Sequence, residues 1–165
     1  MFPFSDASNK VVDVKTICAM TNNTSFCSNL LNSRPGGAAG ADLHTLMQYT
    51  VDVIYGNVTD TIELINMLIA NCNNQDVSAK YHFGLCLRAL ICAKSDIEYN
   101  RNQLQFKNYD RLSVGFALVD TDLQTQTCSV FPPHYNDSSV LPKYVEGVTQ
   151  VNQIIGTIFS LLRSG

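Results

Sequence analysis

The chain has 165 residues, 45% of them hydrophobic, which is enough to bury a core, and we expect one compact domain. Its 11 basic and 14 acidic residues give a formal net charge of −3. Without a basic excess to neutralise phosphates or anionic lipid, nucleic-acid and membrane partners are disfavoured.

Residues 10–33 predict a small helical hairpin. An apolar lead into Cys18 is followed by a polar turn and then by a second apolar run that contains Cys27. Residues 34–40 hold three glycines and a proline, so we expect a loop. This loop lacks the Lys-Ser/Thr pair that a phosphate-binding loop needs. Asp42 is placed to cap the first turn of the helix that follows.

Four amphipathic segments come next, because apolar residues recur in each at steps of three and four. Pro132-Pro133 stop the third segment, and the polar cluster at 136–139 offers a cap for the fourth. The predicted helices span 42–71, from after Asp76 to near Asn108, 112–131 and 140–162.

Each apolar stripe must be covered by its neighbours, so these segments predict an all-α fold. We expect an antiparallel, up-down-up-down four-helix bundle over residues 41–163, preceded by the hairpin, in a single domain of residues 1–165. The bulky side chains expected to fill the bundle are Phe83, Phe106, Phe116 and Phe159.

Six cysteines in a chain of this length suggest a disulfide framework formed in an oxidising compartment. Zinc is the competing explanation, but the chain has no Cys-x-x-Cys pair and its three histidines lie far apart. We therefore expect no metal and no cofactor.

Further evidence for secretion comes from glycan acceptor triplets. They predict glycosylation at Asn22, Asn23, Asn57 and Asn136. The N-terminus lacks the basic start and long apolar run of a signal peptide, so we expect a mature chain whose signal has been removed. No uninterrupted apolar stretch is long enough to span a bilayer.

The order and spacing of these features resemble the plant invertase and pectin methylesterase inhibitors. The similarity starts with the cysteine hairpin, Ile17-Cys18 and Asn22-Asn23-Thr24-Ser25-Phe26-Cys27 followed by Leu30-Leu31. It continues through Ala41-Asp42-Leu43 and the long first bundle helix to Phe83-Gly84-Leu85-Cys86 and Thr127-Cys128. It covers nearly the whole chain.

This resemblance implies two disulfides, Cys18–Cys27 and Cys86–Cys128, the second pair lying 42 positions apart. It also implies secretion to the apoplast and cell wall, or routing to the vacuole for an invertase-directed member. A protein of this kind inhibits its target in a stoichiometric complex, as a monomer or as a dimer that swaps the hairpin.

Cys72 and Cys92 have no clear counterpart in that family. Cys86 and Cys92 lie about 240° apart around one helix, so they cannot bond to each other. A Cys72–Cys92 bridge and a pair of small buried free thiols both stay open.

The segment between the second and third bundle helices should distinguish which enzyme is the target. Invertase-directed members resemble one another in a Pro-Lys-Phe turn, where this chain has Asp110, Arg111 and Leu112. Tyr109-Asp110 and the Thr before the fourth cysteine, Thr127, are more similar to the pectin methylesterase branch. We therefore expect an inhibitor of that esterase, with Tyr109, Asp110, Arg111 and Thr127 facing the target, and invertase as the alternative.

Other functional classes are disfavoured. An enzyme would need an activated nucleophile, yet there is no Gly-x-Ser-x-Gly elbow, and His82 is interpreted as a surface or capping residue. Six-cysteine helical carriers of small ligands resemble one another in a Cys-x-x-x-Cys pair that is absent here. A helical binding or signalling module without inhibitory activity stays open.

Overall fold

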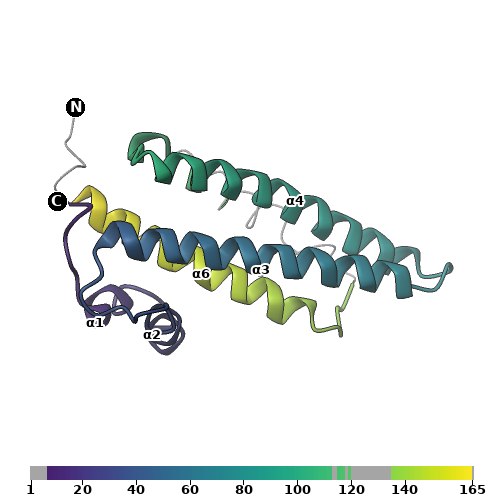
Figure 1. Cartoon of the computed structure of the whole chain (residues 1–165). Coiled ribbons are helices and arrows are strands. Elements are labelled where there is room, and N and C mark those ends of the chain that lie inside the picture. The colour runs from purple at the N-terminus through teal and green to yellow at the C-terminus, as the bar shows by residue number, and fades with distance from the viewer. Residues whose placement is uncertain (1–6, 113–114, 118, 120–134, 165) are drawn as a thin grey trace.

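The computed structural model describes residues 7–112, 115–117, 119 and 135–164. Its fold is an all-α bundle with an N-terminal hairpin, as the sequence predicts (Figure 1). Among the described residues, the only β pairing is an isolated bridge between Val11 and Asp42. The helices are α1 (Val14–Cys18), α2 (Thr24–Asn32), α3 (Leu43–Asn71), α4 (Val77–Gln105) and α6 (Leu141–Arg163).

Helix α3 lies at the centre of the described bundle and packs against both α4 and α6. Its apolar stripe is fully buried at Leu46, Ile54, Val58 and Ile65. Residues 109–112, 115–117 and 119 are helical, so helical structure begins at residue 109, three positions before the predicted start of the third bundle helix at residue 112. No helix in the described part of the chain combines the length and apolarity needed to cross a membrane.

Aspartate side chains cap the starts of α3 and α4. The Asp42 carboxylate accepts a hydrogen bond from the Thr45 amide at 2.7 Å, and Asp76 accepts one from the Ala79 amide at 3.0 Å. Each bond satisfies one of the backbone donors that a helix start leaves without a partner. The capping role predicted for Asp42 is therefore confirmed.

Helix α4 ends earlier than predicted, at Gln105 rather than near Asn108. Lys107 adopts a left-handed backbone with φ of 52°, which stops the helix at that point. Phe106 is 80% exposed, so the expectation that it fills the core is wrong. Phe83, Phe116 and Phe159 are buried as predicted.

The hairpin packs on its own bundle, because α1 and α2 contact each other and both contact α6. A disulfide joins Cys18 to Cys27, as the resemblance implies. The Asn22 amide adds a hydrogen bond to the Gln153 side chain of α6 at 3.2 Å. Cys86 is also disulfide-bonded, and its expected partner, Cys128, lies outside the described residues.

Cys72 and Cys92 are free thiols, so the alternative bridge between them does not form. The Tyr55–Glu98 hydrogen bond fixes how the antiparallel α3 and α4 are aligned. It sets Cys92 level with about residue 61, which leaves roughly 17 Å of helix between it and Cys72. A disulfide needs Cα atoms within about 7 Å. The thiols are not both buried either, since Cys72 is half-buried and Cys92 is exposed.

Candidate functional site

The predicted target-facing turn follows α4 and lies at the end of the bundle where α3 begins. Asp110 and Arg111 are both exposed there, so their charges are available to a partner. Tyr109 is only 3% exposed, which removes its side chain from the surface where it was expected. Thr127 lies outside the described residues, so this structure does not place it.

Tyr109 instead anchors the segment after α4 to the rest of the bundle. Its hydroxyl is 2.6 Å from Nδ1 of His44, and the two rings meet edge to face. The hydroxyl also hydrogen-bonds the Ser8 side chain. Since Asp110 and Arg111 directly follow Tyr109, this anchor fixes where both charges lie.

Burial at this anchor favours the neutral forms of His44 and Tyr109. Burial lowers the pKa of His44, and the nearby Lys107 lowers it further. Burial raises the pKa of Tyr109, so its phenol keeps its proton at neutral pH. For Asp42, burial acts to raise the pKa, but hydrogen bonds from Thr45 outweigh it and the net shift is downward.

The N-terminal segment belongs to the same unit. The Leu43 amide donates to the Lys10 carbonyl at 2.9 Å, and the His44 amide donates to the Ser8 carbonyl at 3.0 Å. Two segments distant in sequence, residues 8–10 and the start of α3, therefore support the segment that contains Tyr109. Sequence reasoning missed His44, because nothing local distinguishes it from the other two histidines.

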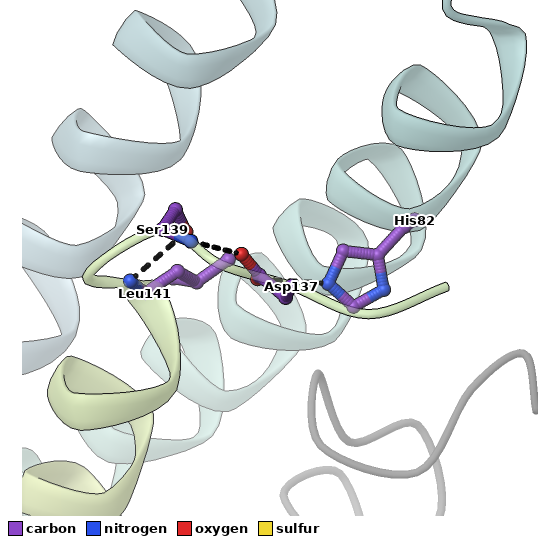
Figure 2. A network of polar contacts seen from close by, with 4 residues as sticks. All are labelled: His82, Asp137, Ser139 and Leu141. Atoms are coloured by element: carbon purple, nitrogen blue, oxygen red, sulfur yellow. Dashed lines mark hydrogen bonds and ion pairs between the residues drawn. The ribbon is translucent and has the colours of Figure 1, made fainter. Parts of the chain in front are cut away.

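A second polar network lies at the opposite end of the bundle (Figure 2). Nε2 of His82 is 3.1 Å from Oδ2 of Asp137, and these side chains are 3% and 6% exposed. The His82 ring also stacks on Tyr135, with centroids 4.5 Å apart. The interpretation of His82 as a surface or capping residue is therefore wrong, since it is a buried anchor for the segment before α6.

The network continues into the start of α6. Oδ1 of Asp137 accepts a hydrogen bond from the Ser139 amide at 2.9 Å, and the Ser139 hydroxyl accepts one from the Leu141 amide at 3.1 Å. Within the predicted capping cluster at 136–139, Ser139 is thus the residue whose side chain accepts a hydrogen bond from the start of α6. A catalytic triad would need His82 to contact the serine hydroxyl. Here the Ser139 hydroxyl accepts from the Leu141 amide and Nε2 of His82 pairs with Asp137, so the network links α4 to the start of α6.

The predicted glycan sites differ in accessibility. Asn22, Asn23 and Asn136 are exposed, whereas Asn57 is half-buried within α3. The Asn23 side-chain oxygen caps α2 by accepting from the Phe26 amide at 3.0 Å. In the described part of the chain, no three His, Cys, Asp or Glu side chains gather as a metal site would require.

Comparisons with known proteins agree with the family resemblance. No protein-family model matches the chain. It is 28% identical over 93 residues to "Pectinesterase inhibitor 2" of Arabidopsis thaliana, a match that covers 53% of each chain. The alignment therefore spans about half the length of that curated relative.

Solved structures match over more of the chain. A mutant form of a pectin methylesterase inhibitor from Arabidopsis matches with a TM-score of 0.73 at 22% identity, covering 88% of this chain and 93% of that one. Another inhibitor structure, from Arabidopsis thaliana, matches with a TM-score of 0.63 at 20% identity, covering 90% and 93%. These matches show a shared fold. The relatives are named as inhibitors, which agrees with the expectation that the chain is not an enzyme.

Proposed function

We propose that this chain, a relative of the pectin methylesterase inhibitors in sequence and in fold, inhibits a plant pectin methylesterase. The observation that carries the proposal is the 28% sequence identity to "Pectinesterase inhibitor 2", since the structural matches lie below 25%. The missing Pro-Lys-Phe turn is a separate argument against invertase as the target.

The proposed mechanism is a stoichiometric complex that covers the esterase's active-site cleft. Specific interfaces bury about 800 Å² per partner and often depend on an arginine or aromatic anchor. Arg111 is our candidate anchor, with Asp110 beside it, because both are exposed in the helical segment after α4 that Tyr109 and His44 hold in place. Thr127 stays a further candidate contact.

We place the inhibitor in the apoplast. The Cys18–Cys27 disulfide is typical of proteins that fold in an oxidising compartment, and Asn22, Asn23 and Asn136 leave acceptor nitrogens accessible for glycans. For its oligomeric state in the complex we propose one inhibitor per esterase. The hairpin packed on its own α6 supports an unswapped arrangement.

Inhibition assays test the proposal. Purified pectin methylesterase and acid invertase are titrated side by side with this protein at mildly acidic pH. We expect esterase activity to fall to a plateau near equimolar inhibitor while invertase is untouched. The reverse pattern would assign invertase instead, and no effect on either would refute inhibition of these targets.

Charge reversals then locate the contact surface. Arg111→Glu should weaken inhibition about tenfold or more if Arg111 is an anchor. Lys143→Glu is the matched control, because it makes the same charge change at an exposed position on α6. Equal effects of the two variants would show that net charge, and not this turn, governs inhibition.

A further inference from the structure

Exposed apolar side chains lie on the outward face of α4 towards both of its ends. Val77 is 72% exposed, Tyr81 60%, Tyr99 43% and Phe106 80%. Counting at 100° per residue, all four lie within about 60° of Cys92 around the helix. Val77 and Tyr81 lie near the start of the helix, Tyr99 lies near its end and Phe106 directly follows it, whereas the middle of the face carries Gly84, Arg88, Cys92 and Ser95. Single exposed apolar residues are ordinary, but several on one face mark an interaction surface.

We propose that this face, which we term the α4 stripe, is the contact surface of a two-fold dimer of the chain. In such a dimer the α4 helices of two copies pack antiparallel, with the axis between Ile91 and Cys92. The inference does not rest on inhibition of any enzyme.

The side chains of the α4 stripe are complementary to a second copy of themselves. Val77 and Phe106 lie equally far from the axis, so each meets the other across it, apolar against apolar. Gly84 and Tyr99 form a second such pair. A Cβ at Gly84 would meet nothing within 4 Å, which leaves room for the Tyr99 ring. A two-fold interface needs this reciprocity between each residue and its counterpart.

The charged and polar side chains of the α4 stripe are also compatible with an antiparallel dimer. Arg88 is exposed and lies opposite the exposed Ser95 of the second copy, whose hydroxyl can accept a hydrogen bond from the guanidinium. An antiparallel pair therefore keeps the two Arg88 side chains apart. A parallel pair would bring them together and would be disfavoured by like-charge repulsion.

The exposed aromatic side chains supply a large part of the area that a dimer needs. Taking about 200 Å² per aromatic side chain, the exposed parts of Tyr81, Tyr99 and Phe106 together offer roughly 370 Å². That is nearly half of the ~800 Å² per partner of a standard interface. Val77, Ile91 and Arg88 are also exposed on or beside the stripe and add to it.

Cys92 lies directly beside the proposed axis. Helix axes about 8–10 Å apart place facing Cα atoms roughly 3.5–5.5 Å apart, because each Cα lies about 2.3 Å from its axis. Disulfides have Cα separations of about 4.4–6.8 Å, so the two Cys92 thiols of a dimer lie within bonding range. Cys92, a free exposed thiol, therefore serves as a reporter of the proposed contact.

Sedimentation equilibrium of the full chain, over a wide range of protein concentration, is the first test. We expect the mass to rise from monomer towards dimer. Tyr99→Lys should weaken association about tenfold or more, since it places two charges in the contact. Tyr144→Lys on α6 is the matched control, because Tyr144 is 44% exposed against 43% for Tyr99, and it should leave association unchanged.

Trapping with oxidised glutathione is the second test. Each pair of Cys92 thiols forms one S–S bond and gives its two electrons and two protons to oxidised glutathione, which becomes two glutathione thiols. We expect the cross-link to be lost in Cys92→Ser, kept in Cys72→Ser and much reduced in Tyr99→Lys. Cys92→Ser should still form the non-covalent dimer.

A wild-type chain that stays monomeric at every concentration would overturn the proposal. So would equal weakening by Tyr99→Lys and Tyr144→Lys, or a cross-link that Tyr99→Lys leaves intact. If the chain is monomeric and Tyr99→Lys abolishes esterase inhibition, the α4 stripe docks the enzyme instead. Failure of the esterase assay alone would leave the dimer result unaffected, so the two proposals fail separately.

Discussion

Gly115 should be irreplaceable by alanine because of the side chain that it faces. A Cβ at position 115 would lie 1.7 Å from Oδ1 and 2.6 Å from Cγ of Asn100. Asn100 belongs to α4 and is fully buried, so its amide cannot swing into solvent to make room. We expect Gly115→Ala to lower the free energy of unfolding by about 1–3 kcal/mol, the usual cost of overpacking a core.

Asn100 is the other half of this contact. Within the described part of the chain, neither of its side-chain polar atoms has a hydrogen-bond partner, and burying such groups costs about 1–3 kcal/mol. Asn100→Ala removes that cost but leaves a cavity, so its own effect should be small. It also removes the three atoms nearest to a Cβ at position 115, which all belong to the Asn100 side chain and lie within 3.0 Å. In the Asn100→Ala background, Gly115→Ala should therefore be neutral or slightly stabilising.

Urea denaturation of the four proteins in this double-mutant cycle measures the coupling, which we expect to be about 1.5 kcal/mol or more. Gly156→Ala is the control. Gly156 is an exposed residue of α6 whose added Cβ meets nothing within 4 Å, so alanine there should stabilise by about 0.5–1 kcal/mol. The reasoning is refuted if Gly115→Ala behaves like Gly156→Ala, or if the cycle is additive.

Three further predictions concern the anchors at the two ends of the bundle and the hairpin. Replacing Cys18 and Cys27 together by Ala should lower the free energy of unfolding by about 2.7 kcal/mol, measured in urea, because the open loop gains entropy when unfolded. Asp137→Ala removes the carboxylate paired with buried His82 and should cost about 1–3 kcal/mol in thermal unfolding, whereas Asp137→Asn should cost less. Burial lowers the pKa of His44 from its usual value of 6.5. On acidification, the unfolded chain therefore takes up a proton at His44 more readily than the folded chain does. The stability that neutral His44 contributes is lost as the pH falls through the pKa of the folded state. The stability difference between wild type and His44→Gln should therefore narrow on acidification from about pH 7 to about pH 5, and a constant difference in urea titrations would contradict this.

The sequence was sufficient for features encoded by nearby residues. The apolar period of α3 follows directly from its residues, and the Asp42 cap connects residues three positions apart. These signals are readable because helical hydrogen bonds and helix faces repeat every few residues. The Cys18–Cys27 disulfide needed the family resemblance as well as the spacing.

Tertiary packing decided which of the predicted residues are exposed. Tyr109 and Arg111 are two positions apart in one short helical segment, yet the first is buried against His44 and the second faces solvent. Likewise, the apolar period predicts that α4 continues past Gln105, but the left-handed backbone of Lys107 ends the helix and Phe106 is exposed.

By itself, therefore, the sequence determined an all-α chain of amphipathic helices, with the caps and the hairpin in their places. Only the tertiary structure decided that His82 is a buried partner of Asp137 and that Gly115 accommodates Asn100. Those pairs join elements that are distant along the chain. The physical reason is that local periodicity specifies which face of a helix is buried, whereas the neighbour that a side chain meets depends on how separate helices align.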